Sequence, residues 1–157
     1  MTGTAPRRRL LIAYHTQSGN TGRLAAAVHA GACEIDETET VLKLAAHCGI
    51  DDLLAAQGLL LGTPENFGYM SGMMKDFFDR TYYPAEGRTL GLPYAVFVSC
   101  GNDGRGAVRE IDRIALGYGW RKVAEPLIVR KEITPADLER CRELGATLAA
   151  GIAYGMF

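Results

Sequence analysis

Five short apolar or alternating runs, most of them separated by helix-like segments, constrain this chain's fold more than any other feature. The runs span residues 9–14, 40–44, 57–62, 94–99 and 122–129. The run at 57–62 is continuously apolar, which is typical of a strand buried on both faces of a parallel sheet. Strands that alternate with helices connect right-handedly, so the pattern predicts an α/β fold with a doubly wound parallel sheet of five strands.

Helical patterns occupy most of the intervals between the predicted strands. We expect helices over residues 21–32, 72–82 and 107–116, a short one opening near Asp51, and a final one after Thr134. Ser71 and Thr134 are predicted N-caps, and Asp137 completes a capping box with Thr134. Within the second helix, apolar side chains recur at helical spacing and should face the sheet. These residues, with one preceding the helix, are Met70, Met74, Phe77, Phe78 and Thr81.

Two breaks in the pattern are predicted to be irregular. Residues 63–70 should not form regular structure, because Pro64 lacks an N–H donor and Gly68 permits unusual backbone angles. Pro84, with the glycines that follow, marks a loop before the fourth strand. The residues before Arg8 are expected to form a loose tail.

Composition and charge exclude several classes of protein. The 157 residues suit a single domain covering residues 1–157, and nearly half of them are hydrophobic, which argues against disorder. The formal net charge of −1 gives no electrostatic case for nucleic-acid binding. No run is long enough to span a membrane, and the apolar stretch after Arg7-Arg8-Arg9 is too short for a signal peptide.

The cysteines indicate reduced thiols. Cys33, Cys48, Cys100 and Cys141 form no Cys-x-x-Cys pair, and the histidines do not lie at metal-ligand spacing beside them. We therefore expect a cytoplasmic protein without a metal site. Cys48 and Cys141 are best interpreted as small core residues.

The polar loop after the first strand is the strongest candidate for a binding site. It reads Thr16-Gln17-Ser18-Gly19-Asn20-Thr21 and precedes a helix, whose first backbone N–H groups and dipole favour an anion. A Walker-type loop would need Gly-Lys-Ser/Thr, and this loop has no Lys or Arg before Arg23. Neutral donors suit one phosphate monoester better than a triphosphate. The alternative, a Ser/Thr-rich turn that only caps the helix, stays open from the loop alone.

Two further loops belong to the same predicted edge of the sheet. They span residues 63–69 and 99–106, and like the first loop they follow strands and are rich in glycine, hydroxyl and amide groups. In doubly wound sheets, ligands bind beyond the carboxyl ends of the strands, at the switch point. The third loop is not a dinucleotide fingerprint, since Arg109 occupies the position of the third glycine.

Taken together, the three loops resemble those of the flavodoxin-like family of FMN-binding proteins. Residues 16–21 look like the family's FMN phosphate loop. Residues 62–77, with Thr63-Pro64, Phe67-Gly68 and the cap Ser71-Gly72, are similar to the NAD(P)H-dependent quinone- and FMN-reductase branch. The turn from Cys100 to Gly104 looks closer to an electron-carrier flavodoxin. The resemblance implies a three-layer sandwich with strand order 2-1-3-4-5 and FMN as the cofactor.

The resemblance also implies which residues contact FMN. The first loop would hold the phosphate, the second would line the isoalloxazine ring with Phe67 or Tyr69 stacked on it, and the third would line the ring's other edge. The implied cofactor-binding residues are Thr16, Gln17, Ser18, Gly19, Asn20, Thr21, Thr63, Pro64, Glu65, Asn66, Phe67, Gly68, Tyr69, Ser99, Cys100, Gly101, Asn102 and Asp103. No catalytic side chain is expected, because the flavin itself performs the electron chemistry.

Several residues near these loops have two interpretations. Cys100 is a strand-end residue or, less simply, a reactive thiol, and His15 either helps to neutralise a phosphate or is a bystander at the helix cap. Arg105 and Arg109 attract nicotinamide nucleotide phosphates or are solvated helix positions, and the second interpretation is preferred.

The resemblance implies an oxidoreductase that passes hydride from NAD(P)H through FMN to a small acceptor such as a quinone. The first alternative is a flavodoxin-type one-electron carrier with a redox protein partner, against which the near-neutral charge weighs. The second is a flavin-free binding module with the same fold. A monomer or a homodimer is compatible with the sequence.

Overall fold

The computed structural model describes residues 6–157, and its strands confirm the predicted order of the sheet. Residues 1–5, part of the predicted tail, lie outside the described residues. Three long parallel strands form the centre: β1 (Arg8–Tyr14), β3 (Gly58–Asn66) and β5 (Pro93–Cys100). The edge strand β2 (Thr38–Leu44) pairs with β1 over seven residues. On the opposite side, β6 (Arg121–Lys122) and β7 (Leu127–Arg130) both pair with β5.

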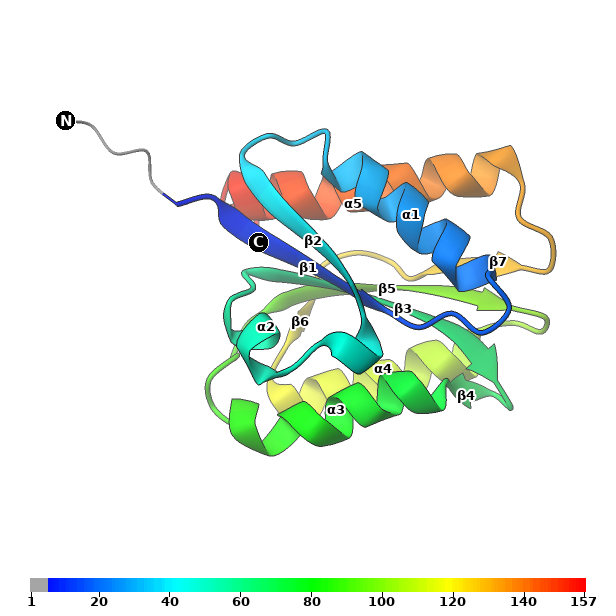
Figure 1. Cartoon of the computed structure of the whole chain (residues 1–157), viewed down its shortest axis with the longest axis horizontal. Helices are drawn as coiled ribbons and strands as arrows, with labels where there is room; N and C mark the ends of the chain where they lie inside the picture. The colour runs from blue at the N-terminus through cyan, green and yellow to red at the C-terminus, as the bar shows by residue number, and fades with distance from the viewer. Residues whose placement is uncertain (1–5) are drawn as a thin grey trace.

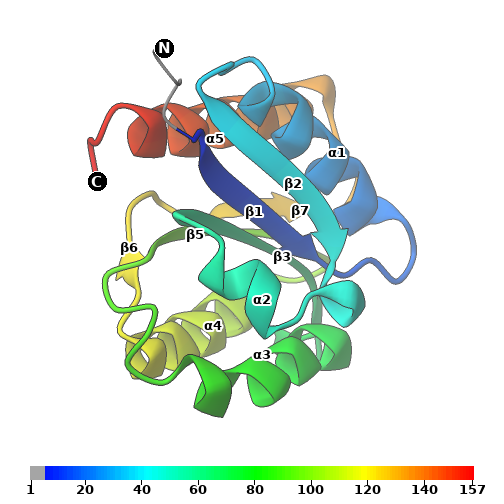
Figure 2. The same ribbon diagram turned by 60° about the vertical axis from the view of Figure 1, so that its left-hand side comes forward.

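Helices cover both faces of the sheet (Figure 1). One layer contains α1 (Asn20–Ala32) and α5 (Pro135–Ala153), and the other contains α3 (Gly72–Ala85) and α4 (Arg105–Tyr118). Figure 2 shows the shorter α2 (Ile50–Leu54) on the α3 and α4 side, after the 3₁₀ turn η1 (Ala45–His47). This arrangement is the predicted three-layer sandwich. The predicted caps are confirmed, with Ser71 Oγ accepting from Met74 N–H and Thr134 sharing a capping box with Asp137.

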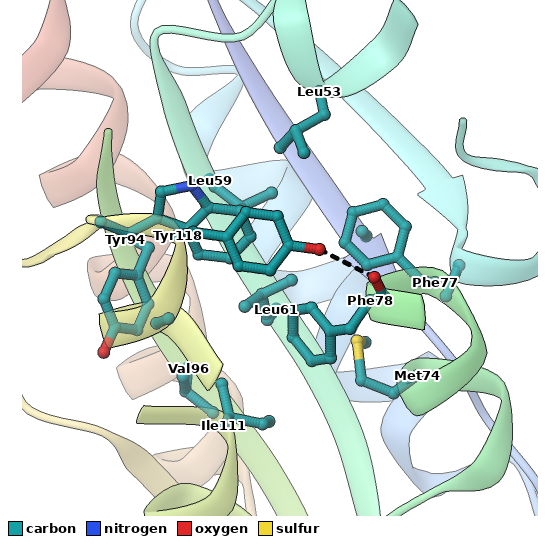
Figure 3. Close-up of a cluster of buried hydrophobic side chains, with 14 of the residues drawn as sticks. Leu53, Leu59, Leu61, Met74, Phe77, Phe78, Tyr94, Val96, Ile111 and Tyr118 are labelled. Atoms are coloured by element: carbon teal, nitrogen blue, oxygen red, sulfur yellow. Dashed lines mark hydrogen bonds between the residues drawn. The ribbon is translucent and has the colours of Figure 1, made fainter. Parts of the chain in front are cut away.

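Each face of the sheet has its own hydrophobic core. On the α3 and α4 side, Phe77, Phe78 and Met74 pack on Leu59 and Leu61 (Figure 3). All five predicted inward residues of the α3 region are buried, as are Cys48 and Cys141. Polar atoms inside this core are paired, as when the Tyr118 hydroxyl donates to the Phe78 carbonyl at 2.9 Å (Figure 3). Burial of the large side chains, worth about 1.5–3 kcal/mol each, holds the layers and therefore the loops at the sheet edge in place.

The prediction that residues 63–70 are irregular is wrong. β3 continues to Asn66, and β4 (Tyr69–Met70) returns antiparallel to it, with Glu65 opposite Met70. Phe67 and Gly68, between the strands, have φ of 52° and 70°. Positive φ at both central positions is what a two-residue type I′ hairpin turn needs. The sequence hid this hairpin because Phe is an unusual first residue for such a turn.

Smaller corrections concern element ends. α3 runs through Pro84 to Ala85, so Pro84 stands one residue before the end of the helix, where its missing N–H removes a single helical hydrogen bond, to the Arg80 carbonyl. β2 begins at Thr38, two residues before the predicted start at Thr40, and the Thr38 hydroxyl donates to the Ala149 carbonyl at 2.8 Å. The expected fifth strand is split into β6 and β7 by residues 123–126, and β4 is an additional strand, so the sheet has seven strands within residues 6–157 rather than five.

Candidate functional site

A cleft of about 680 Å³ lies at the carboxyl ends of the central strands. The connections that follow β1, β3, β5 and β7 all reach this end of the sheet, on the right of Figure 1. The cleft is lined by Gln17, Ser18, Asn20, Arg23, Pro64, Glu65, Asn66, Ser99, Cys100, Gly101, Lys131, Glu132 and Ile133. Parallel strands therefore bring together four segments that are far apart in the sequence.

The loop before α1 presents open backbone donors. Gly19 is the N-cap, with φ of 104°, a left-handed conformation that glycine adopts without strain. Its N–H donates to Thr16 Oγ1 at 3.2 Å. The N–H groups of Asn20, Thr21 and Gly22 have no hydrogen-bond partner within residues 6–157. The first turn of α1 also contains no acidic residue. Its N–H groups and helix dipole are therefore available to an anion.

His15 adds a second unpaired group beside this loop. Its backbone N–H donates to the Gly62 carbonyl at 3.0 Å, which ties the start of the loop to β3. Its Nδ1 atom is buried and has no hydrogen-bond partner within the described part of the chain. Burial lowers the pKa of the His15 imidazole, so the ring is neutral at pH 7. A buried unpaired ring nitrogen is costly and indicates a missing partner near the loop.

The β3–β4 hairpin forms one wall of the cleft. The Asn66 side-chain amide donates to Gln17 Oε1 at 3.0 Å and so connects the second loop with the first. Glu65 reaches the opposite way: its carboxylate accepts from Gly104 N–H at 3.2 Å and from Ala107 N–H at 3.5 Å. Glu65 thus caps α4, whose own N-cap glycine cannot.

The third loop is held by β7. The Lys131 N–H donates to the Cys100 carbonyl at 2.7 Å, and the Arg130 Nε donates to the Asn102 carbonyl at 2.7 Å. The Cys100 thiol donates to the Asn102 carbonyl at 3.4 Å, and burial, with a smaller effect of the Glu65 carboxylate, raises its pKa. A protonated thiol engaged in this way fits a strand-end structural residue rather than a nucleophile.

Half of the predicted contact residues line the cleft. They are Gln17, Ser18, Asn20, Pro64, Glu65, Asn66, Ser99, Cys100 and Gly101. Thr16 and Gly19 shape the first loop through their mutual hydrogen bond. Gly68, Asn102 and Asp103 line a second hollow beside the cleft, which also touches Glu65.

Four further predicted residues do not line the cleft with their side chains. Thr21 is buried, and its hydroxyl pairs with that of Ser99 at 2.7 Å. Thr63 is also buried, donating to the Pro64 carbonyl and accepting from Ser71 N–H. Phe67 has a fully exposed side chain at the hairpin tip, and Tyr69 lies half-buried on β4.

Sequence reasoning missed four residues of the lining. Arg23 lies in the first turn of α1, while Lys131, Glu132 and Ile133 follow β7. The signal for the last three was available, because the fifth strand of a parallel sheet also ends at this edge. Lys131 is exposed and has a φ of 58°, and it contributes a positive charge to the cleft.

None of the helices within residues 6–157 is both long and apolar enough to cross a membrane. Across the same residues, no group of three or more His, Cys, Asp or Glu side chains is placed to hold a metal ion.

Comparisons with known proteins identify the family. The model of the family described as NADPH-dependent FMN reductase matches residues 46–125. A protein named flavodoxin from Aquifex aeolicus is 31% identical over 161 residues, covering 92% of this chain and 87% of the relative. A protein named NAD(P)H dehydrogenase (quinone) from Syntrophus aciditrophicus is 28% identical, covering 92% and 85%.

Solved structures agree on the fold. The structure of a flavodoxin from the domain Archaea superposes with a TM-score of 0.79 at 22% identity, covering 92% of this chain and 98% of that one. The chain therefore belongs to the flavodoxin-like family of FMN-binding proteins that contains flavodoxins and NADPH-dependent FMN reductases.

Proposed function

We propose that the chain is an FMN-dependent oxidoreductase that accepts hydride from NAD(P)H and reduces a small acceptor such as a quinone. One observation carries the proposal: an open cleft at the sheet edge with an acid-free, unsatisfied helix N-terminus at one end. Its volume of about 680 Å³ lies within the range typical of cofactor pockets. The family match and the quinone dehydrogenase relatives support the reductase branch.

The residues of the cleft fit FMN. A phosphate monoester needs several donors, which the open N–H groups of residues 20–22 and the Ser18 hydroxyl provide. The first turn of α1 contains no acidic residue that would compete for these donors. The unpaired Nδ1 of His15 is a further group that a bound phosphate can help to satisfy. Arg23 and Lys131 add positive charge around the cleft.

The rest of the cleft can hold a flat, mostly apolar ring. Pro64 and the backbone around Asn66 form one wall, and Cys100 with Gly101 the other. The hydrogen bond from Asn66 to Gln17 joins the β3–β4 hairpin to the loop before α1. FMN, when bound, supplies the hydride and electron chemistry, and the chain binds it, orients it and limits its contact with water.

The experiment begins with the purified protein. We expect it to be yellow or to take up added FMN, and its flavin absorption to bleach when NADPH or NADH is mixed in without oxygen. Addition of a quinone should restore the absorption. A colourless protein that ignores added FMN would contradict the proposal.

A second candidate function is one-electron transfer as a flavodoxin-type carrier. The relative named flavodoxin, which aligns over 92% of this chain, supports it. The two functions separate in the same experiment. A yellow protein that neither nucleotide bleaches, but that a reducing redox protein does bleach, is a carrier rather than a reductase.

A further inference from the structure

A second hollow, of about 580 Å³, adjoins the candidate cleft. It is lined by Glu65, Gly68, Asn102, Asp103, Arg105, Gly106, Arg109 and Arg130. Glu65 lines both cavities, so they are neighbours separated by the β3–β4 hairpin. Its volume is in the range of small-molecule sites, and three arginines distinguish it from the cleft.

The charges around the hollow favour an anion. The two carboxylates are already engaged: Glu65 caps α4, and Asp103 accepts from Arg105 N–H at 3.1 Å. Arg105 makes no side-chain hydrogen bond or ion pair within residues 6–157. Arg109 contacts only Glu110, at 3.3 Å, through a side chain that is 72% exposed. An exposed pair of this kind contributes little, so both guanidinium groups are free to bind.

The hollow and the candidate flavin cleft share the β3–β4 hairpin, which packs against α4. A methyl group on Gly106 would overlap the carbonyl oxygen of Gly68, so the hairpin tip rests directly on the first turn of α4. Arg130 also lines the hollow, and its Nε donates to the Asn102 carbonyl. A ligand that fills this hollow therefore lies beside the wall of the cleft and not on a remote surface.

We propose that this hollow binds the phosphate groups of the adenylyl half of the nicotinamide donor, with Arg105 and Arg109 as the principal contacts. The inference rests on the proposed reductase function. Planar guanidinium groups match phosphate oxygens, often with two hydrogen bonds each. A 2′-phosphate monoester carries more charge than a bridging phosphodiester, so NADPH gains more than NADH from this site. Arg105 and Arg109 are exposed, as the preferred sequence interpretation expects, and the proposal gives these solvated positions a ligand.

The test measures equilibrium binding. FMN-loaded protein, verified by its flavin absorption, is titrated calorimetrically with NADP⁺ and with NAD⁺, which cannot be consumed. We expect Arg105→Gln and Arg109→Gln each to raise the Kd of NADP⁺ about tenfold, and that of NAD⁺ less. Arg113→Gln is the matched control, because Arg113 is exposed on the same helix but lies outside the hollow. It should change the Kd less than about twofold.

The outcomes separate the inference from the proposed function. Arg105→Gln and Arg109→Gln proteins that bind NADP⁺ like the Arg113→Gln control would overturn the inference, while bleaching by NADPH would leave the function standing. If nucleotide binding is unchanged but electron exchange with an acidic protein such as ferredoxin slows, the hollow docks a protein and the inference is also wrong. A parent protein that binds neither FMN nor nucleotide would overturn both.

Discussion

Two helix N-termini lie at the same edge of the sheet, and their surroundings differ. Both α1 and α4 follow central strands, and both begin after a left-handed glycine that provides no side-chain cap, Gly19 and Gly104. At α4, the carboxylates of Glu65 and Asp103 occupy the N–H groups. At α1, no carboxylate does. The first N–H groups of α4 are thus occupied by the protein's own carboxylates, whereas those of α1 remain available to an external anion.

Because the N–H groups before α1 are open, we expect the FMN phosphate to bind there. A negative charge introduced into this loop should therefore have the largest effect on FMN affinity. Ser18→Asp places a carboxylate among the open donors, where it repels a phosphate at short range. We expect FMN to bind about a hundredfold more weakly, equivalent to about 2.7 kcal/mol. Fluorescence titration with FMN measures this. Ser18→Asn is the neutral control, and its affinity for FMN should change little. Riboflavin, which has no phosphate, should bind Ser18→Asp about as well as it binds the parent protein.

At the start of α4, the β3–β4 hairpin that carries Glu65 packs directly on the helix backbone at Gly106. Gly106→Ala would force the Gly68 carbonyl and the hairpin away from the helix. We expect a loss of about 1–3 kcal/mol in the free energy of unfolding, measured in urea. Gly117→Ala is the matched control on the same helix, because a new methyl there would meet only Tyr82 Cε1 at an ordinary 3.7 Å. That variant should be stabilised by up to about 1 kcal/mol. Equal stabilities would show that the hairpin does not rest on α4.

Removing one of the two carboxylates at the start of α4 should leave part of its N–H groups open, as at α1. Glu65→Ala uncaps α4 and should lower the free energy of unfolding by about 1–2 kcal/mol. Added sulfate should recover part of this loss, since it can bind the freed N–H groups. Glu132→Ala is the control, because Glu132 also lines the cleft but makes no hydrogen bond within residues 6–157. A Glu65→Ala protein as stable as that control would disprove the capping role.

The smallest effect concerns pH. The pKa of His15 is lowered by burial, so the unfolded chain takes up this proton before the folded one does. The ligand-free protein should therefore lose some stability as pH falls from about 7 to about 5. The pKa values of Asp52 and Asp137 are also lowered, but protonation of these carboxylates reduces stability only below about pH 4. Urea unfolding at several pH values measures the slope. His15→Gln should flatten it, and bound FMN should do so too, because a phosphate nearby favours the protonated ring. If His15→Gln leaves the dependence of the unfolding free energy on pH unchanged, other titrating groups cause that dependence.

The sequence predicted those parts of the site that are formed by residues contiguous in the chain. Residues 16–21 could be identified because a strand, a glycine-containing polar turn and a helix start are contiguous there. Right-handed crossovers predicted a doubly wound parallel sheet, and its strand order came from the resemblance to the flavodoxin-like family. The Thr21 to Ser99 pair could not be predicted, because it depends on how β1 and β5 align across the intervening β3. Glu65 read as a ring-lining residue, and only the hairpin turn at Phe67-Gly68 shows that its carboxylate reaches α4.

The most direct measurement is a crystal structure of the FMN-loaded protein. The phosphate should lie within hydrogen-bond distance of the N–H groups of Thr21 and Gly22, while the Glu65 carboxylate remains on the first turn of α4. A phosphate found at the start of α4, or a loop at residues 16–21 that contacts no phosphate, would contradict the account.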